Sequence, residues 1–314
     1  MKFLWRLGAA ALVSVLLVSL AGCTSGARPG GNDGSETSST SSTTPPPPDV
    51  RTLFQEIDAT MDRLTSLDAD FSLRMTTILG ESSLVTNMSG NLRMAGLPDK
   101  PVFTADITTS SMGQSVSLSL YYADKMLYLA GKDAYMDSKI KVPVPTDDSG
   151  DADEETAALL EEKIKPKLEK ILESAAVVEK GGDAQVTLTI PSADLWDLAE
   201  ILAAGIPEDT FSGDLDLSEQ PELSDMKVTL TIDSDRYLTE MLMEGEITAP
   251  MQTEDASSPV SSEPTTIRLS FSTKLNHPGE PAEVTPPADL DAYQEQPTDD
   301  ENLWEEEFSG YELL

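Results

Sequence analysis

The chain has 314 residues, of which 39% are hydrophobic and 5% aromatic, so it is long and apolar enough to form a substantial core. Its 56 Asp and Glu outnumber 21 Lys and Arg, and the formal net charge of -35 excludes nucleic acid as a partner because it repels phosphates. One His and one Cys are too few for a His-based triad, a multi-Cys zinc site or a disulfide framework. We therefore expect no metal and no cofactor.

The N-terminus reads as an export signal. Two basic residues precede an apolar stretch, residues 7–20, which is too short to cross a hydrocarbon core of about 30 Å and leads into Leu20, Ala21, Gly22 and Cys23. These four residues resemble the bacterial lipobox. The resemblance implies that residues 1–22 are removed and that Cys23 is lipidated. We expect a protein anchored in the cell membrane through this lipid, on the extracytoplasmic face.

Two segments have the composition of disordered chain. Residues 23–49 consist of the cysteine and a run rich in Ser, Thr, Gly and Pro, which is typical of a flexible tether. Residues 294–314 are acidic with interspersed aromatic residues, and we expect a mostly unstructured tail. The segment between them, residues 50–293, is predicted to form one domain.

The first half of this domain is predicted to be a helix followed by a meander. Apolar residues recur at helical spacing over residues 50–65, and from Leu67 onward they alternate with polar residues at the period of a strand. Turn residues such as Gly80 and Gly113 separate the runs. The predicted strands cover residues 67–77, 84–94, 102–109, 115–122, 126–130 and 135–142.

The second half mixes helices and strands. An apolar stripe predicts a helix over residues 156–178 that Pro166 kinks or splits, and a shorter helix is predicted to follow Pro191. Further strands are predicted at residues 185–190, 226–233, 238–248 and 266–275. The fold class expected from this pattern is α+β, with one large antiparallel sheet and helices on one face.

Three stretches resemble a known group of proteins. They are YYADKMLY at 121–128 with YMD at 135–137, VTLTI at 228–232 with DSD at 233–235, and FSTKLN at 271–276 with VTPP at 284–287. In these stretches the chain is similar to lipoproteins of Gram-positive bacteria with a LolA/LppX-like fold. The resemblance implies a strongly curved, unclosed half-barrel with helices over its concave face. Characterised carriers of that fold hold acyl chains there, and they share no catalytic residues.

On this fold we expect an apolar cavity between sheet and helices. A plain, filled core would account for the same side chains, so both interpretations stay open. The residues expected to line the cavity are Phe71, Leu73, Met75, Met88, Leu92, Leu118, Leu120, Met126, Leu160, Ile164, Leu168 and Trp196.

Two functions of different classes fit these expectations. The first is binding of a lipid or another amphipathic ligand by a monomeric, membrane-anchored protein. The alternative is a non-enzymatic surface interaction or sensor module that presents its sheet edge, acidic loops or tail to a protein partner. An enzyme is not expected, because His277 lies among turn residues with no second His as partner, and three Trp are too few for the aromatic groove of a glycosidase. The acidic run at 147–155 lacks the spacing of an EF-hand, so we expect a solvated loop there.

Overall fold

The computed structural model describes residues 49–97, 100–132, 137–144, 166–195, 222–249 and 264–295, and these ranges form one continuous sheet with a few helices. Residues 166–173 and 192–195 are also helical. The labelled elements in chain order are α2 (Val50–Met61), β1 (Ser66–Leu79), β2 (Ser82–Ala95), β3 (Val102–Ser111), β4 (Gln114–Ala123), β5 (Met126–Lys132), β6 (Asp137–Pro143), β7 (Ala176–Lys180), β8 (Asp183–Ile190), β9 (Glu222–Leu223), β10 (Met226–Ile232), β11 (Leu238–Ala249), β12 (Thr265–Leu275), η2 (Leu290–Ala292) and β13 (Gln294–Glu295).

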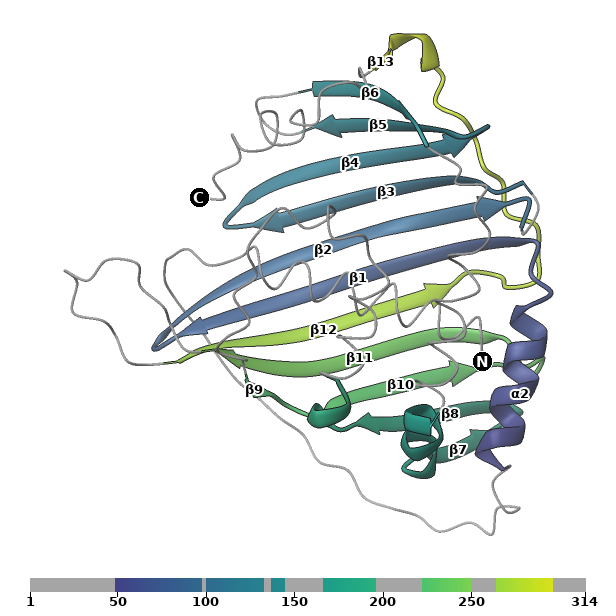
Figure 1. Cartoon of the computed structure of the whole chain (residues 1–314), viewed down its shortest axis with the longest axis vertical. Coiled ribbons are helices and arrows are strands. Elements are labelled where there is room, and N and C mark those ends of the chain that lie inside the picture. The colour runs from purple at the N-terminus through teal and green to yellow at the C-terminus, as the bar shows by residue number, and fades with distance from the viewer. Residues whose placement is uncertain are drawn as a thin grey trace.

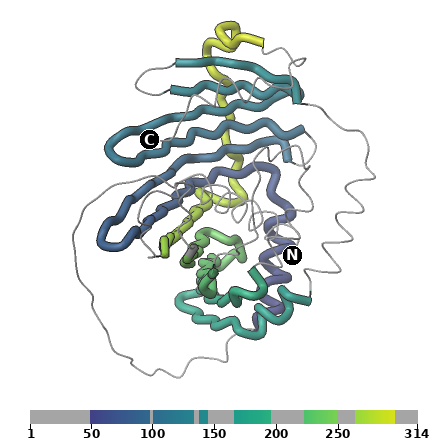
Figure 2. The backbone as a smooth tube through the Cα atoms, turned by 60° about the vertical axis from the view of Figure 1, so that its left-hand side comes forward, coloured from purple at the N-terminus to yellow at the C-terminus, as the bar shows by residue number. Residues whose placement is uncertain are grey.

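The described strands make a 13-stranded sheet in the order β13-β6-β5-β4-β3-β2-β1-β12-β11-β10-β8-β7, with β9 paired to β11 (Figure 1). All pairs are antiparallel except β13 with β6. The sheet curls strongly from β12 to β7, as Figure 2 shows, and its two ends do not pair with each other. The expected α+β class with an unclosed, half-barrel-like sheet is confirmed.

Helix α2 covers one half of the sheet. Asp49 caps it by accepting a hydrogen bond from the Arg51 backbone N–H at 3.4 Å, and Leu53, Ile57 and Met61 form a buried stripe at the spacing of one helix face. This stripe belongs to one core with side chains of β1, β8, β10, β11 and β12 and of the helix 166–173. We call the sheet face that contacts α2 the inner face.

The opposite, outer face carries the C-terminal segment, residues 276–295. Asn276 donates hydrogen bonds to Asp68 and Asp70, and the Ser66 hydroxyl accepts one from the Ala282 backbone N–H at 3.0 Å. Further along, Tyr293 is buried and its ring packs edge-on against Tyr128 of β5, with ring centroids 5.4 Å apart. The segment therefore leads from the end of β12 to the far edge strand β6, where β13 pairs.

The sequence prediction was wrong for part of the second half. The helix expected to continue to residue 178 ends before β7, where Val177 and Val178 pair with β8. Gly181 and Gly182, with φ of 67° and 98°, make the two-residue turn of this hairpin. Gln294 and Glu295, expected to begin the acidic tail, are instead paired with β6.

Candidate functional site

The inner face continues beyond the core onto strands β2 to β6. Strand pairing defines this surface, because directly paired residues point to the same side of a sheet. Leu73 in the core of β1 pairs with Met88 of β2, and the alternation then carries the inner face to Leu118 and Leu120 of β4. The same register reaches Ile140 of β6 through Leu129 of β5.

Apolar side chains dominate this extension, and most of them are half-buried. The buried core of the described residues ends at β2, where Met88, Leu92 and Met94 pack against it. The apolar inner-face residues of β3 to β6 are Phe103, Ala105, Ile107, Val116, Leu118, Leu120, Tyr122, Leu127, Leu129, Ile140 and Val142, of which only Ala105 is buried. We call the inner face of β2 to β6 the apolar cradle.

Charge is segregated between the two faces of these strands. No inner-face position of β2 to β6 carries a charged side chain, although a quarter of the chain is charged. The charged residues on the outer face of the same strands are Arg93, Asp106, Lys132, Asp137, Lys139 and Lys141. The cradle therefore offers apolar contact to a ligand and no ion pair.

Two aromatic contacts shape the cradle. Phe71 lies over Gly90, where an added Cβ would come within 2.7 Å of the Phe71 Cζ atom and 2.2 Å of the Asp106 carbonyl oxygen, so only glycine fits. Phe103 and Tyr122 stack on neighbouring strands with ring centroids 5.2 Å apart and an interplanar angle of 18°. The stacked rings of Phe103 and Tyr122 give the cradle a half-buried aromatic patch.

The cradle changes in character along its strands. At the end where β3 turns into β4, the inner face carries the hydroxyls of Thr109 and Ser111 beside the exposed Val116. The Thr86 hydroxyl donates a hydrogen bond to the Ser111 hydroxyl there at 3.1 Å. At the other end, near the C-terminus of α2, the inner-face residues are apolar, as in Met94 and Leu127. Such a surface matches an amphipathic molecule, with chains on the apolar part and a polar group near the hydroxyls.

The structure brings together most of the residues predicted to line a cavity. Leu73 and Met75 are buried in the core, and Phe71, Met88 and Leu92 are half-buried beside it. Leu118 and Leu120 lie within the cradle. Leu168 is half-buried in the helix 166–173.

The prediction that Met126 lines the cavity was wrong. Met126 pairs with Ala123 on the outer face, and its neighbour Leu127 pairs with Tyr122 on the inner face. The prediction missed most of β3, including Phe103 and Ile107, although the alternation of that strand pointed to them. Leu160, Ile164 and Trp196 lie outside the described residues, as do Cys23 with its lipobox and the acidic run at 147–155.

Comparison with known proteins places the chain in a family. The model of a family of unknown function, DUF6612, matches residues 49–277. The chain belongs to the DUF6612 family. No curated protein matches the sequence.

One solved structure that is similar is a DUF1329 family protein from Desulfovibrio piger. The match has 9% sequence identity and covers 73% of this chain and 94% of that chain, at a TM-score of 0.24. The strand pairing of the chain itself defines its fold.

Reactive groups in the described part of the DUF6612 domain do not gather at the cradle. Those residues hold no group of three or more His, Cys, Asp or Glu side chains that could bind a metal ion. They also contain no helix that is both long and apolar enough to cross a membrane. His277 is exposed in a turn with φ of 47°, as its neighbours in the sequence predicted.

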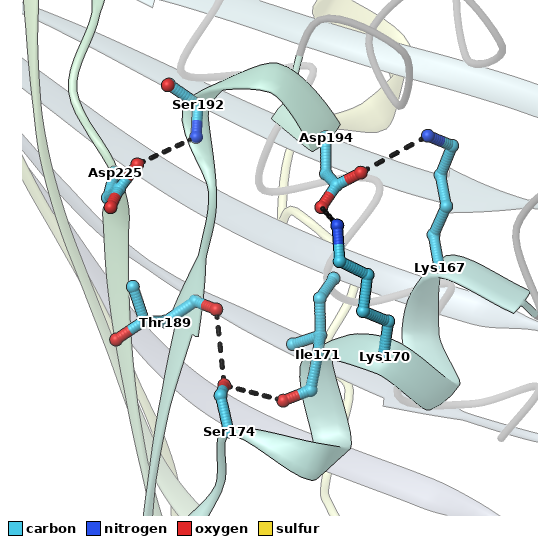
Figure 3. Close-up of polar contacts among 8 residues, drawn as sticks. All are labelled: Lys167, Lys170, Ile171, Ser174, Thr189, Ser192, Asp194 and Asp225. Carbon is cyan, nitrogen blue, oxygen red and sulfur yellow. Dashed lines mark hydrogen bonds and ion pairs between the residues drawn. The ribbon is translucent and has the colours of Figure 1, made fainter.

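Among the described residues, the most buried carboxylate is that of Asp194, and its contacts are structural. Asp194 accepts hydrogen bonds from Lys167 and Lys170, each at 3.3 Å, and so ties the helix 166–173 to the turn of helix at 192–195 (Figure 3). Burial raises the pKa of Asp194, whereas the two lysines lower it, and the net pKa lies below the usual value of an aspartate. Nearby, Asp225 accepts a hydrogen bond from the Ser192 backbone N–H at 2.9 Å.

We predict that Asp194→Asn destabilises the protein at pH 7, by about 1–3 kcal/mol, because the carboxylate charge that pairs with Lys167 and Lys170 is lost and a neutral amide oxygen accepts from them more weakly. A carboxylate whose pKa is lowered by folding stabilises the fold above its unfolded pKa, and this contribution disappears as the pH falls through the folded pKa. The difference between wild type and variant should therefore shrink below a pH of about 4. Urea unfolding at pH 7 and pH 3 measures this difference in the free energy of unfolding, and the exposed Asp235→Asn is the control. A difference that does not change with pH would show that the ion pairs are not its source.

Proposed function

We propose that this DUF6612 protein is a membrane-anchored extracytoplasmic lipoprotein that binds a lipid or another amphipathic ligand in the apolar cradle. The observation that carries the proposal is the uncharged, half-buried apolar surface of β2 to β6 in a chain with a net charge of -35. Burial of acyl chains against these side chains would contribute about 0.8 kcal/mol per methylene. The resemblance of its strands to LolA/LppX-like lipoproteins also supports the proposal.

The hydroxyl-bearing end of the cradle supports an amphipathic ligand over a plain hydrocarbon. Thr86, Thr109 and Ser111 can hydrogen-bond to a headgroup, and none of them can form an ion pair with it. A ligand with an uncharged polar group fits this end best. Anionic lipids would also meet the repulsion of the acidic protein around the cradle.

We predict that Leu118→Asp abolishes ligand binding, because it places a charge in the cradle that an acyl chain cannot solvate. The matched control is Ser117→Asp on the outer face of the same strand, where the new carboxylate lies opposite Lys132. Native mass spectrometry of the mature chain with Cys23→Ser, followed by organic extraction, measures the lipid adducts.

Under the proposal, wild type and Ser117→Asp carry extractable lipid and Leu118→Asp carries none. Clean masses for all three proteins, even after incubation with envelope lipids, would contradict lipid binding. That result would favour the alternative, a non-enzymatic surface module that binds a protein partner.

We predict that Cys23→Ala prevents anchoring, because the lipobox resemblance assigns the diacylglyceryl group to the thiol of this sole cysteine. Partitioning of cell extracts with a phase-separating detergent measures membrane anchoring. Wild type should enter the detergent phase and incorporate labelled fatty acid, and Cys23→Ala should do neither. Equal incorporation of labelled fatty acid by both proteins would refute the assignment.

A further inference from the structure

The β3–β4 hairpin stands out by its lack of charge. Residues 107–123 contain no Asp, Glu, Lys, Arg or His, although 25% of the whole chain is charged. Ser, Thr and Gln side chains surround its turn instead. In a protein with a net charge of -35, this hairpin is a place where a lipid headgroup layer meets little repulsion.

The tip of the hairpin exposes apolar side chains. Met112 is 50% exposed and Val116 is 46% exposed, and the only other large hydrophobic residue this open in the described part of the chain is Val178, at 63% on the edge strand β7. Val116 lies on the inner face, two residues before Leu118, so the tip is continuous with the cradle. A Cβ added at Gly113 would meet no atom within 4 Å, so the space around the turn at this residue is open.

Met112 also has a strained backbone. Its φ is 49° and that of Gly113 is 80°, the left-handed conformations that a tight two-residue turn requires. Asn, Asp and Gly adopt this conformation readily, whereas a bulky side chain rarely does. The other non-glycine residues with positive φ in the described part of the chain are Asp124, Lys125, Arg236 and His277, all of them polar. An exposed methionine at such a position adds nothing to the buried core, and a residue with unfavourable backbone geometry of this kind is a candidate for a functional contact.

We propose that the β3–β4 hairpin tip, Met112 with Val116, contacts the surface of a lipid bilayer and delivers lipid to the cradle. This inference rests on the proposed function. Two apolar side chains are too few for a stable protein interface, which buries about 800 Å² per partner. They suffice for shallow insertion by a protein that its own lipid anchor already holds at the membrane, because tethering raises the local concentration.

The contact is tested with the lipid-anchored protein in phosphatidylcholine vesicles. Met112→Cys introduces a thiol for an environment-sensitive fluorophore, and Val178→Cys is the matched control on the far edge of the sheet. Lipids that carry a nitroxide on the acyl chain should quench the fluorophore at residue 112 and leave residue 178 unquenched. Equal quenching at the two positions, or none at either, would overturn the proposed contact.

Delivery is tested by two routes of loading. Met112→Asp should slow the uptake of a fluorescent neutral lipid from vesicles by about tenfold, because a charge at the tip opposes insertion. It should leave equilibrium uptake from ethanol-dispersed lipid unchanged, and it should not lower Tm, since aspartate suits the positive φ. Val178→Asp should change neither route. Unchanged vesicle uptake by Met112→Asp would refute delivery through the tip, whereas no uptake by either route in wild type would refute the proposed function itself.

Discussion

The pairing of β1 with β12 is the contact on which the rest of the structure depends. It joins the N-terminal meander, β1 to β6, to the strands of the second half, β7 to β12, across about 200 residues of sequence. Paired positions such as Leu73 with Phe271 and Met75 with Leu269 continue the inner face across this seam. On the outer face, Ser72 and Ser272 share a hydrogen bond at 2.8 Å, and Asn276 binds Asp68 and Asp70. Without this seam, the meander would have no core to be anchored to.

The two sides of this seam differ in how the described residues cover the inner face. Helix α2 and the helix 166–173 supply apolar side chains to β1, β12, β11, β10 and β8. Among the described residues, this cover ends at β2, and the inner face of β3 to β6 keeps its apolar character with its side chains half-exposed. Apolar surface of this extent, free of charge in a strongly acidic protein, is typical of a binding site. The aromatic stack of Phe103 on Tyr122 and the hydroxyls near the β3–β4 turn give the site two distinct ends.

Much of the first half of the fold was predictable from the sequence, because its strands are joined by local turns and alternate at a period of two. The β1–β12 seam was not, since it depends on pairing between segments far apart in the chain. Strand β5 shows a second limit: Met126, Leu127, Tyr128 and Leu129 are all apolar, so alternation does not reveal which of them face inward. In the structure, Tyr128 packs against Tyr293 of the C-terminal segment, so Tyr128 faces outward and its neighbours Leu127 and Leu129 face inward. The local spacing of its residues predicted helix for strand β7. That prediction was wrong because pairing with its hairpin partner, β8, decides the conformation of its valines more than their local spacing does.

Photo-cross-linking with a lipid that carries a diazirine in its acyl chain shows whether the cradle binds acyl chains. The mature protein is loaded with this lipid and illuminated, and mass spectrometry of the peptides then maps the adducts. If the cradle binds acyl chains, adducts concentrate on inner-face residues of β2 to β5, such as Ile107, Leu118 and Leu120. Adducts on outer-face residues such as Tyr121 and Lys132, or an even spread over both faces, would contradict the account.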